Sequence, residues 1–158
     1  MHERASQFAA RAAEEYGFEV DVHEFPEGTK TAADAADAIG CAVAQIASSI
    51  AVIADGDLIV VVTSGANRVD FEKVADLQEV PEGTVRMANA DEIKETLGWS
   101  IGGVPPFCHS TRVPVYLDET LLSHDQVWAA AGTPQTVFPI DPDTLTSFSE
   151  ATVADVRT

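Results

Sequence analysis

The spacing of apolar positions along the chain predicts several helices. In residues 3–16 apolar side chains recur every three or four positions, the period of a helix with one buried face, and Gly17 is a natural end. Thr31 can cap a second, alanine-rich helix that runs to Ile39 and ends at Gly40. Three shorter helices are expected, at residues 70–77, at residues 91–97 and after Asp141-Pro142.

Short β-prone runs predict the strands. Two long runs flank Asp55-Gly56, a dipeptide that favours a tight hairpin turn, so residues 45–54 and 57–63 are expected to pair. The other expected strands are residues 20–25, 85–88, 113–117, 127–131 and 136–140, with a turn at 26–28 and a link through Gly132. Strands and helices mix without a regular strand–helix–strand repeat. The pattern therefore predicts a mixed α/β fold, with helices packed around a mixed or mostly antiparallel sheet.

Length and composition limit the architecture. The chain has 158 residues, 46% of them hydrophobic, which is enough for one well-packed core, and we expect a single domain over residues 1–158. No apolar run approaches the roughly 20 residues that a membrane-spanning helix needs. The first four residues lead into an alanine- and glutamate-rich segment without an apolar signal sequence. We therefore expect a cytoplasmic protein with no membrane partner.

The charge balance is strongly acidic. There are 26 acidic and 9 basic residues, which gives a formal net charge of −17. Such a surface repels itself at low salt, and salt relieves the repulsion by shortening the screening length. The charge is spread along the whole chain, which favours a halophilic protein in a high-salt cytoplasm over recognition of one basic partner. Composition gives no support to tight, phosphate-driven nucleic-acid binding, and DNA is not expected as a partner.

Residues 98–109 have the composition of a binding loop. Gly102 and Gly103 allow backbone conformations that other residues avoid, and they let a ligand approach amides that can stabilise an oxyanion. Pro105 and Pro106 stiffen the chain that follows. A tight crossover between two elements needs the same residues, and the pattern alone leaves this alternative open.

The histidines and cysteines suggest structural roles first. A lone histidine more often forms a structural hydrogen bond than acts as a base, and this applies to His23, His109 and His124. Cys108 lies next to His109, but adjacent residues seldom point the right way for a Cys–His pair. With Cys41 it is expected to be a buried free thiol, since two cysteines cannot form a disulfide framework.

Ser48 and Ser49 interrupt an apolar run. A buried hydroxyl must find a hydrogen-bond partner, so one of the two is expected to face a polar surface or a pocket. No metal-binding or nucleotide-binding motif occurs, and neither a metal nor a cofactor is expected.

Several segments, taken together, resemble one known family. They are the alanine-rich stretch from Thr31 to Gly40, the run Gln45-Ile46-Ala47-Ser48-Ser49-Ile50, Gly65 with Arg68-Val69-Asp70, the Gly-Gly-Val-Pro-Pro-Phe loop at 102–107, Val115-Tyr116-Leu117-Asp118 with Leu121-Leu122, and Ala131-Gly132. In order and spacing they resemble the YbaK/prolyl-tRNA-synthetase-associated family over residues 20–148. The resemblance implies a mixed α/β fold with a curved, mostly antiparallel sheet.

The resemblance also implies an activity and a site. The activity is hydrolysis of mischarged aminoacyl-tRNA in trans, which releases a wrong amino acid from the acceptor end of the tRNA without a metal. By position, the backbone of Gly102 and Gly103 would hold the aminoacyl carbonyl, and the substrate's own ribose hydroxyl would help to activate water. The residues expected to contact substrate are Thr31 at the pocket mouth, Val104, Pro105, Pro106, Phe107, Cys108 and His109.

Ser48 is a candidate catalytic position that departs from the family pattern. The family commonly has a lysine there, whose charge can anchor a phosphate or the terminal adenosine, and a serine hydroxyl cannot replace it. Either another cation such as Lys30 or Arg68 substitutes, or the substrate differs, or catalysis is lost. Cys108 also stands where many relatives carry a small residue, often glycine.

Three functions remain open at this point. The first is a trans-editing aminoacyl-tRNA deacylase, and the second is a non-catalytic module that binds an amino acid, a nucleotide or a protein in the same pocket. The third is a hydrolase of small esters or thioesters built on His109 or Cys108. A basic patch near the pocket would support the first function, and the residues that could form it are Arg68, Lys73, Arg86 and Arg112.

Overall fold

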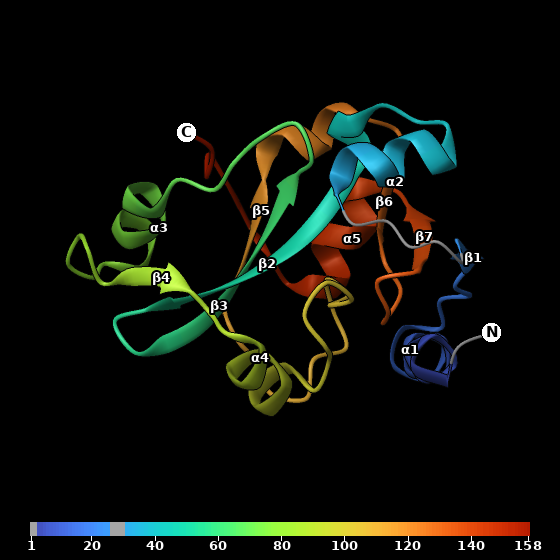
Figure 1. Ribbon diagram of the computed structural model, residues 1–158, viewed down its shortest axis with the longest axis horizontal. Coiled ribbons are helices and arrows are strands. Elements are labelled where there is room, and N and C mark those ends of the chain that lie inside the picture. The colour runs from blue at the N-terminus through green and yellow to red at the C-terminus, as the bar shows by residue number, and fades with distance from the viewer. Residues whose placement is uncertain (1–2, 26–30) are drawn as a thin grey trace.

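The computed structural model describes residues 3–25 and 31–158, and in that part of the chain eight strands form one sheet. The strands are β1 His23–Glu24, β2 Ile46–Ala54, β3 Asp57–Ser64, β4 Val85–Met87, β5 Val115–Asp118, β6 Val127–Ala130, β7 Thr136–Ile140 and β8 Thr152–Ala154. The α-helices are α1 Glu3–Tyr16, α2 Ala32–Ile39, α3 Phe71–Gln78, α4 Ala90–Leu97 and α5 Pro142–Ser149. The predicted mixed α/β fold, with helices around a sheet, is confirmed (Figure 1).

The β2–β3 hairpin is the centre of the sheet and crosses the molecule, with α2 near its open end and α3 and β4 near its turn (Figure 1). Its turn residues, Asp55 and Gly56, both have positive φ, 49° and 92°, as the Asp-Gly dipeptide predicts. The strand order is β1-β7-β6-β2-β3-β5-β8, with β4 paired to β2 beside this path. Four pairings of the described strands are antiparallel and three are parallel, so antiparallel pairs hold only a small majority.

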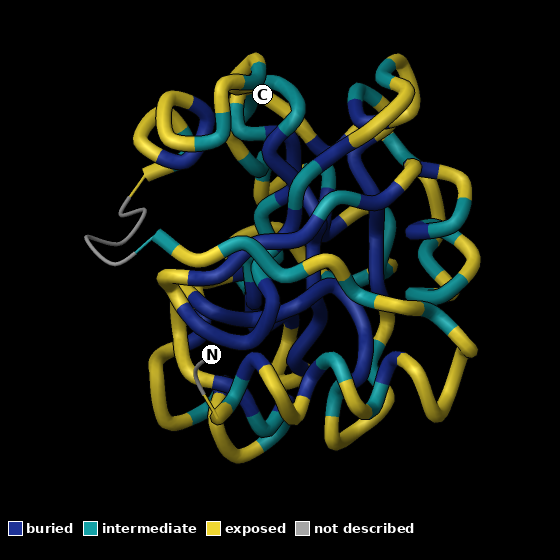
Figure 2. The backbone as a smooth tube through the Cα atoms, turned by 90° about the vertical axis from the view of Figure 1, so that its right-hand side faces the viewer, coloured by how far each residue is buried: buried dark blue, intermediate teal, exposed yellow. Residues whose placement is uncertain are grey.

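The sheet buries side chains on both faces. On one face Phe8 of α1 packs with Phe107 and Phe138 in the largest core cluster. On the other face Val74 of α3 belongs to a second cluster of strand and helix residues, and α2 covers a third, smaller one that includes Ile46. Figure 2 shows the buried segments through the middle of the molecule, with exposed residues on the outer turns and loops.

The helix ends follow the local sequence signals. The hydroxyl of Thr31 accepts a hydrogen bond from the Asp34 N–H at 3.1 Å, and Gly40 ends α2 with a left-handed φ of 86°. Asn89 and Glu92 each accept a hydrogen bond from the other's backbone N–H, and this reciprocal cap starts α4 one residue earlier than predicted. None of the helices in the described chain is long and apolar enough to cross a membrane.

Some strand predictions are wrong in extent. Of residues 20–25 only His23–Glu24 form a strand, because β7 pairs with these two residues alone. The turn predicted at 26–28 lies outside the described residues. The strand predicted over 113–117 begins at Val115, since Pro114 has no N–H to contribute to a ladder. β8 was not predicted, because it is three residues long and two of them are exposed, which leaves no alternating pattern.

Candidate active site

The edge of β2 that faces away from β3 is shared by two short strands. β6 pairs with Ile46 and Ala47, and β4 pairs with residues 52–54. Among the strands that the structure describes, none pairs with residues 48–51 on this edge. A cavity of about 350 Å³ lies along the open stretch, lined by α2, β2, the loop after α4 and the β6–β7 pair. The interrupted pairing therefore leaves room for a ligand beside the backbone of β2.

Four of the predicted site residues line this cavity: Thr31, Ser48, Gly102 and Val104. They come from the start of α2, the middle of β2 and the loop between α4 and β5, so the fold brings together segments far apart in the sequence. The hydroxyl of Thr31 is already engaged by the Asp34 N–H as the cap of α2. Thr31 therefore positions the helix and forms part of the wall.

Gly102 is the third residue of a tight turn at the cavity. The turn runs from Ser100 to Gly103 and is closed by a hydrogen bond from the Gly103 N–H to the Ser100 carbonyl at 3.0 Å. Gly102 is exposed and has φ of 86°, a conformation that side chains rarely adopt. Its own N–H forms no hydrogen bond within the described chain. This N–H is therefore available to donate a hydrogen bond to a ligand, as predicted for the binding of a substrate carbonyl.

Gly103 has a different role from the one predicted for it. It is buried and does not line the cavity, and its N–H is already used within the turn. A Cβ atom at this position would lie 2.6 Å from the Cα of Thr133, in the β6–β7 connection. A glycine is required here because two backbones pack against each other. The expectation that Gly103 holds a substrate carbonyl is therefore not supported by this geometry.

The rest of the loop does not reach the cavity. Pro105, Pro106 and Phe107 are buried and do not line the cavity along β2. The ring of Phe107 lies 5.4 Å from that of Phe8 and 5.9 Å from that of Phe138 between centroids, inside the main core. These residues, predicted to shape the amino-acid pocket, instead anchor the loop.

Cys108 and His109 also lie away from the cavity, although the sequence placed them among the substrate contacts. The Cys108 thiol donates to Glu15 at 3.2 Å, and burial together with this hydrogen bond raises its pKa to about 12. His109 donates from Nε2 to the Pro105 carbonyl at 2.8 Å, and burial lowers its pKa. The thiol stays protonated and the imidazole is engaged by a backbone group. The geometry does not favour a hydrolase built on either residue.

Ser48 and Ser49 both line the cavity. Successive strand residues point to opposite faces, so Ser49 shares the face of Ala47 and Ala51, which belong to the main core cluster. The Oγ atom of Ser49 is buried and has no hydrogen-bond partner in the described chain. The sequence did not place Ser49 among the site residues, although a hydroxyl inside an apolar run was the signal that could have done so.

No charged side chain lines the cavity in the part of the chain that the structure describes. Three of the four basic candidates are held by carboxylates elsewhere: Arg86 by Glu92, Lys73 by Asp155 and Arg112 by Glu150. Arg68 does not line the cavity, and Lys30 lies outside the described residues. The described residues therefore do not line the cavity with the basic patch that would have supported the deacylase function.

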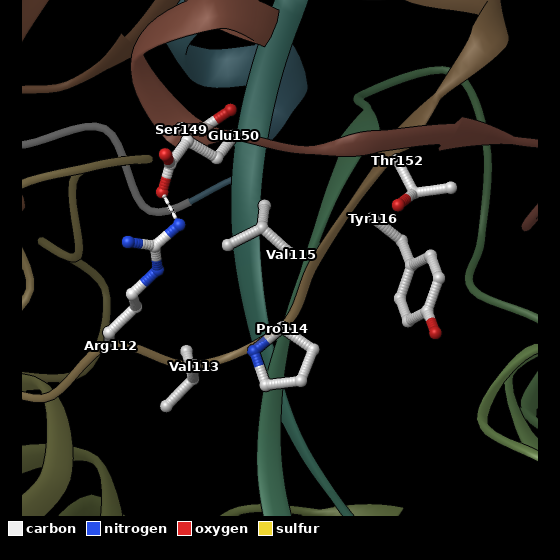
Figure 3. Close-up of a pocket in the computed structure, with 8 residues that line it drawn as sticks. All are labelled: Arg112, Val113, Pro114, Val115, Tyr116, Ser149, Glu150 and Thr152. Carbon is white, nitrogen blue, oxygen red and sulfur yellow. Dashed lines mark ion pairs between the residues drawn. The ribbon is translucent and has the colours of Figure 1, made fainter.

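A second hollow, of about 390 Å³, lies beside the chain that leads into β5. Figure 3 shows Val113, Pro114 and Val115 along it, with the Arg112 guanidinium turned toward the Glu150 carboxylate in an ion pair. These two charged side chains are 80% and 59% exposed, and none of the predicted site residues lines this hollow. Another hollow, of about 220 Å³, is lined by Pro106, Phe107, Cys108 and His109, but by neither glycine of the loop. The cavity along β2, which Gly102 lines, is therefore the candidate site.

An open strand edge, a glycine turn with an unpaired amide and an uncharged, mostly apolar cavity make this a candidate small-ligand site in a mixed α/β protein. Nowhere in residues 3–25 and 31–158 do three or more metal-ligating side chains lie together. Residues 26–148 match the model of the aminoacyl-tRNA editing domain, and the chain belongs to this family. The resemblance stated from the sequence is thereby confirmed.

Similar proteins cover from 83% to 100% of the chain. A protein described as a "putative trans-editing enzyme for prolyl tRNA synthetase" is 38% identical and superposes with a TM-score of 0.91, covering 100% of this chain and 99% of its own. The hypothetical protein APE2540 is 27% identical, with a TM-score of 0.84 over 96% of this chain and 99% of its own. The uncharacterized protein YwhH of Bacillus subtilis (strain 168) is 33% identical over 132 residues, 83% of this chain and 82% of its own.

Proposed function

We propose that this protein hydrolyses mischarged aminoacyl-tRNA in trans, with the aminoacyl ester bound in the cavity along β2. The observation that carries the proposal is Gly102, which is exposed at the cavity with an N–H that no described residue engages. Membership of the aminoacyl-tRNA editing family supports the substrate class, and so does the similarity to the structure described as a prolyl tRNA synthetase trans-editing protein.

The proposed chemistry is attack of water on an ester. The Gly102 N–H donates to the carbonyl oxygen, where negative charge develops as water adds to the carbonyl carbon. The bond between that carbon and the ribose oxygen then breaks, and the ribose oxygen takes a proton. The products are a free amino acid and an uncharged tRNA.

The group that activates water is supplied by the substrate in this proposal. No histidine, aspartate or glutamate lines the cavity within the described residues, so no side chain there is suited to act as a general base. The neighbouring hydroxyl of the substrate's terminal ribose lies next to the ester and can orient the attacking water. This assigns to the protein the tasks of binding the ester and polarising its carbonyl.

Recognition of the RNA must rely on more than charge. The net charge of −17 repels a phosphate backbone, and the described lining of the cavity offers no cation. We therefore propose that the terminal nucleotide is held by shape and by stacking, and that binding is best at high salt.

The first test is hydrolysis of a panel of mischarged tRNAs, including alanyl- and cysteinyl-tRNA(Pro), in high potassium chloride. Gly102→Ala places a methyl group 3.6 Å from Pro134, an ordinary contact, but its φ of 86° strains the backbone and displaces the amide. We expect this variant to hydrolyse the preferred substrate about 100-fold more slowly or worse.

The matched control is Gly83→Ala. Gly83 has nearly the same φ, 83°, and no heavy atom lies within 4 Å of the position of an added Cβ. Gly83 does not line the cavity, so Gly83→Ala should lower the stability of the protein without lowering the rate of hydrolysis. If Gly102→Ala hydrolysed the preferred substrate as fast as Gly83→Ala does, the proposed role of the Gly102 amide would be contradicted.

A second candidate function is a binding module that uses the same cavity without turnover. Ser48 favours this second function, because a hydroxyl stands where the family commonly has a lysine. The described lining of the cavity holds no charged side chain that could replace the lysine. This function would replace the first if the folded protein hydrolysed no substrate in the panel but still bound an aminoacyl-adenosine analogue.

A further inference from the structure

Ser49 is a polar residue of the cavity that the proposed hydrolysis does not use. It lines the cavity from the middle of β2, and its Oγ atom is buried without a partner among the described residues. Buried hydroxyl groups in folded proteins nearly always form a hydrogen bond, because leaving one unpaired is costly. An unpaired hydroxyl in the wall of a cavity therefore points to a group on a ligand.

The backbone N–H and C=O of Ser49 point to the edge of β2 that faces away from β3. The Ile46 carbonyl accepts from the Gly65 N–H on the β3 side, whereas the Ala51 carbonyl accepts from the Ala88 N–H on the opposite edge. Backbone groups alternate between the two edges of a strand, so the N–H and C=O of Ser49 point the same way as those of Ala51. In the described sheet that edge has no strand partner at this position.

An aminoacyl group is a suitable partner for this edge. A free strand edge can pair with the main-chain groups of a ligand, and the Ser49 carbonyl can accept from an α-ammonium group. The side chain of an aminoacyl group held in this way lies close to the Ser49 side chain.

The surroundings of Ser49 limit which side chain fits. Ala47 and Ala51 flank it on its own face, and Ala88 and Val104 belong to the same cluster and line the same cavity. This corner is apolar apart from the Ser49 hydroxyl and therefore favours an uncharged side chain. A methyl group there leaves the Ser49 hydroxyl unpaired, whereas a hydroxyl group pairs with it.

We infer that Ser49 is a specificity-determining residue that selects aminoacyl groups with a small hydroxyl side chain, seryl before alanyl, by a direct hydrogen bond. This rests on the function proposed above. Rotation of the Ser49 side chain among its staggered positions turns the hydroxyl toward the ligand. Ser49 is not a nucleophile, because within the described residues no histidine, carboxylate or lysine lines the cavity to take its proton.

The experiment compares hydrolysis of one tRNA, tRNA(Pro), charged with serine or with alanine, by the wild-type protein, Ser49→Ala and Ser48→Ala. We expect wild type to have a kcat/KM about 10- to 100-fold higher for the seryl ester, the range for an unpaired buried polar group. Ser49→Ala should bring the two esters to within about threefold. Ser48→Ala is the matched control, since it removes a hydroxyl one residue away on the other face of β2 and should keep the preference.

Three results would overturn the assignment: a wild-type preference for alanyl ester, a preference that survives in Ser49→Ala, or one lost equally in Ser48→Ala. If neither ester is hydrolysed, binding of the non-hydrolysable amides 3′-serylamino- and 3′-alanylamino-3′-deoxyadenosine is measured by calorimetry. Tighter binding of the seryl amide, lost in Ser49→Ala, keeps the assignment while the proposed deacylation fails. Equal binding of the two amides overturns the assignment itself.

Discussion

Asp118 holds together three parts of the chain at the residue scale. It is fully buried at the end of β5, where one carboxylate oxygen accepts hydrogen bonds from the Ser64 N–H at 3.1 Å and from Asn67 at 2.9 Å. The other oxygen accepts from the Thr120 N–H at 3.0 Å. Burial alone would raise the pKa of Asp118, but the hydrogen bonds outweigh burial and the pKa is lowered. Its carboxylate is therefore a stabilising group in its charged form.

Asp118→Asn should lower the free energy of unfolding at pH 7 by about 2–4 kcal/mol, because an amide cannot accept all of these hydrogen bonds. The folded pKa lies below the unfolded value of about 3.9, so the contribution is present above that pH and is lost as pH falls through the folded pKa. The difference between wild type and variant should therefore shrink at pH 3. Urea unfolding at both pH values measures it, with the exposed Asp125→Asn as control. A difference that grows on acidification would contradict this account.

At the scale of elements, α1 supports the loop that carries Gly102. Phe8 of α1 contacts Trp99 and Phe107, which stand on either side of the Ser100–Gly103 turn, at ring distances of 6.1 and 5.4 Å. The Arg4 guanidinium lies over the Trp99 ring at 4.5 Å. The loop is therefore held from one side by a helix more than eighty residues earlier in the chain.

Phe8→Ala should destabilise the protein by about 3–5 kcal/mol, since it removes a fully buried ring from the centre of this cluster. Phe71→Ala makes the same change in a side chain that is 37% exposed at the start of α3, and it should cost about 1 kcal/mol or less. Urea unfolding measures both. Similar losses for the two variants would mean that α1 does not anchor the loop through Phe8.

Charge acts at the scale of the whole molecule. Four of the described lysines and arginines form ion pairs with single carboxylates near the surface, as Arg86 does with Glu92 and Lys73 with Asp155. Such pairs contribute little, and they leave most of the 26 acidic residues to repel one another. The net repulsion is reduced when the Debye length falls from about 10 Å at 0.1 M salt to about 3 Å at 1 M.

Raising potassium chloride from 0.1 to 1 M should therefore stabilise the fold, by on the order of 1 kcal/mol, or about 2–4 °C in Tm. Thermal unfolding followed by circular dichroism measures the shift, and sodium chloride at the same ionic strength should have the same effect. A Tm that stays constant or falls in both salts would remove the argument for adaptation to high salt.

Local structure was predictable from the sequence to within a few residues. The hairpin at Asp55-Gly56, the cap at Thr31 and the stop at Gly40 each depend on residues that lie close to one another in the chain. β8 was missed because it exists only through its parallel pairing with β5. For the site, four of the predicted residues line one cavity, and the family resemblance was what connected them: Thr31, Ser48, Gly102 and Val104.

The sequence by itself determined the class of fold and the position of the glycine loop, because capping, turns and apolar periodicity are short-range interactions. The family came from the resemblance of several segments, in their order and spacing, to a known family. Only the tertiary structure decided which groups of the site are free. Gly103 is occupied because the backbone of Thr133 packs against it, and Phe107 is drawn into the core by Phe8. Ser49 lines the cavity because β4 and β6, both distant in the chain, stop short of it on one edge of β2. Which polar groups remain unpaired depends on contacts between distant segments, and no local pattern records them.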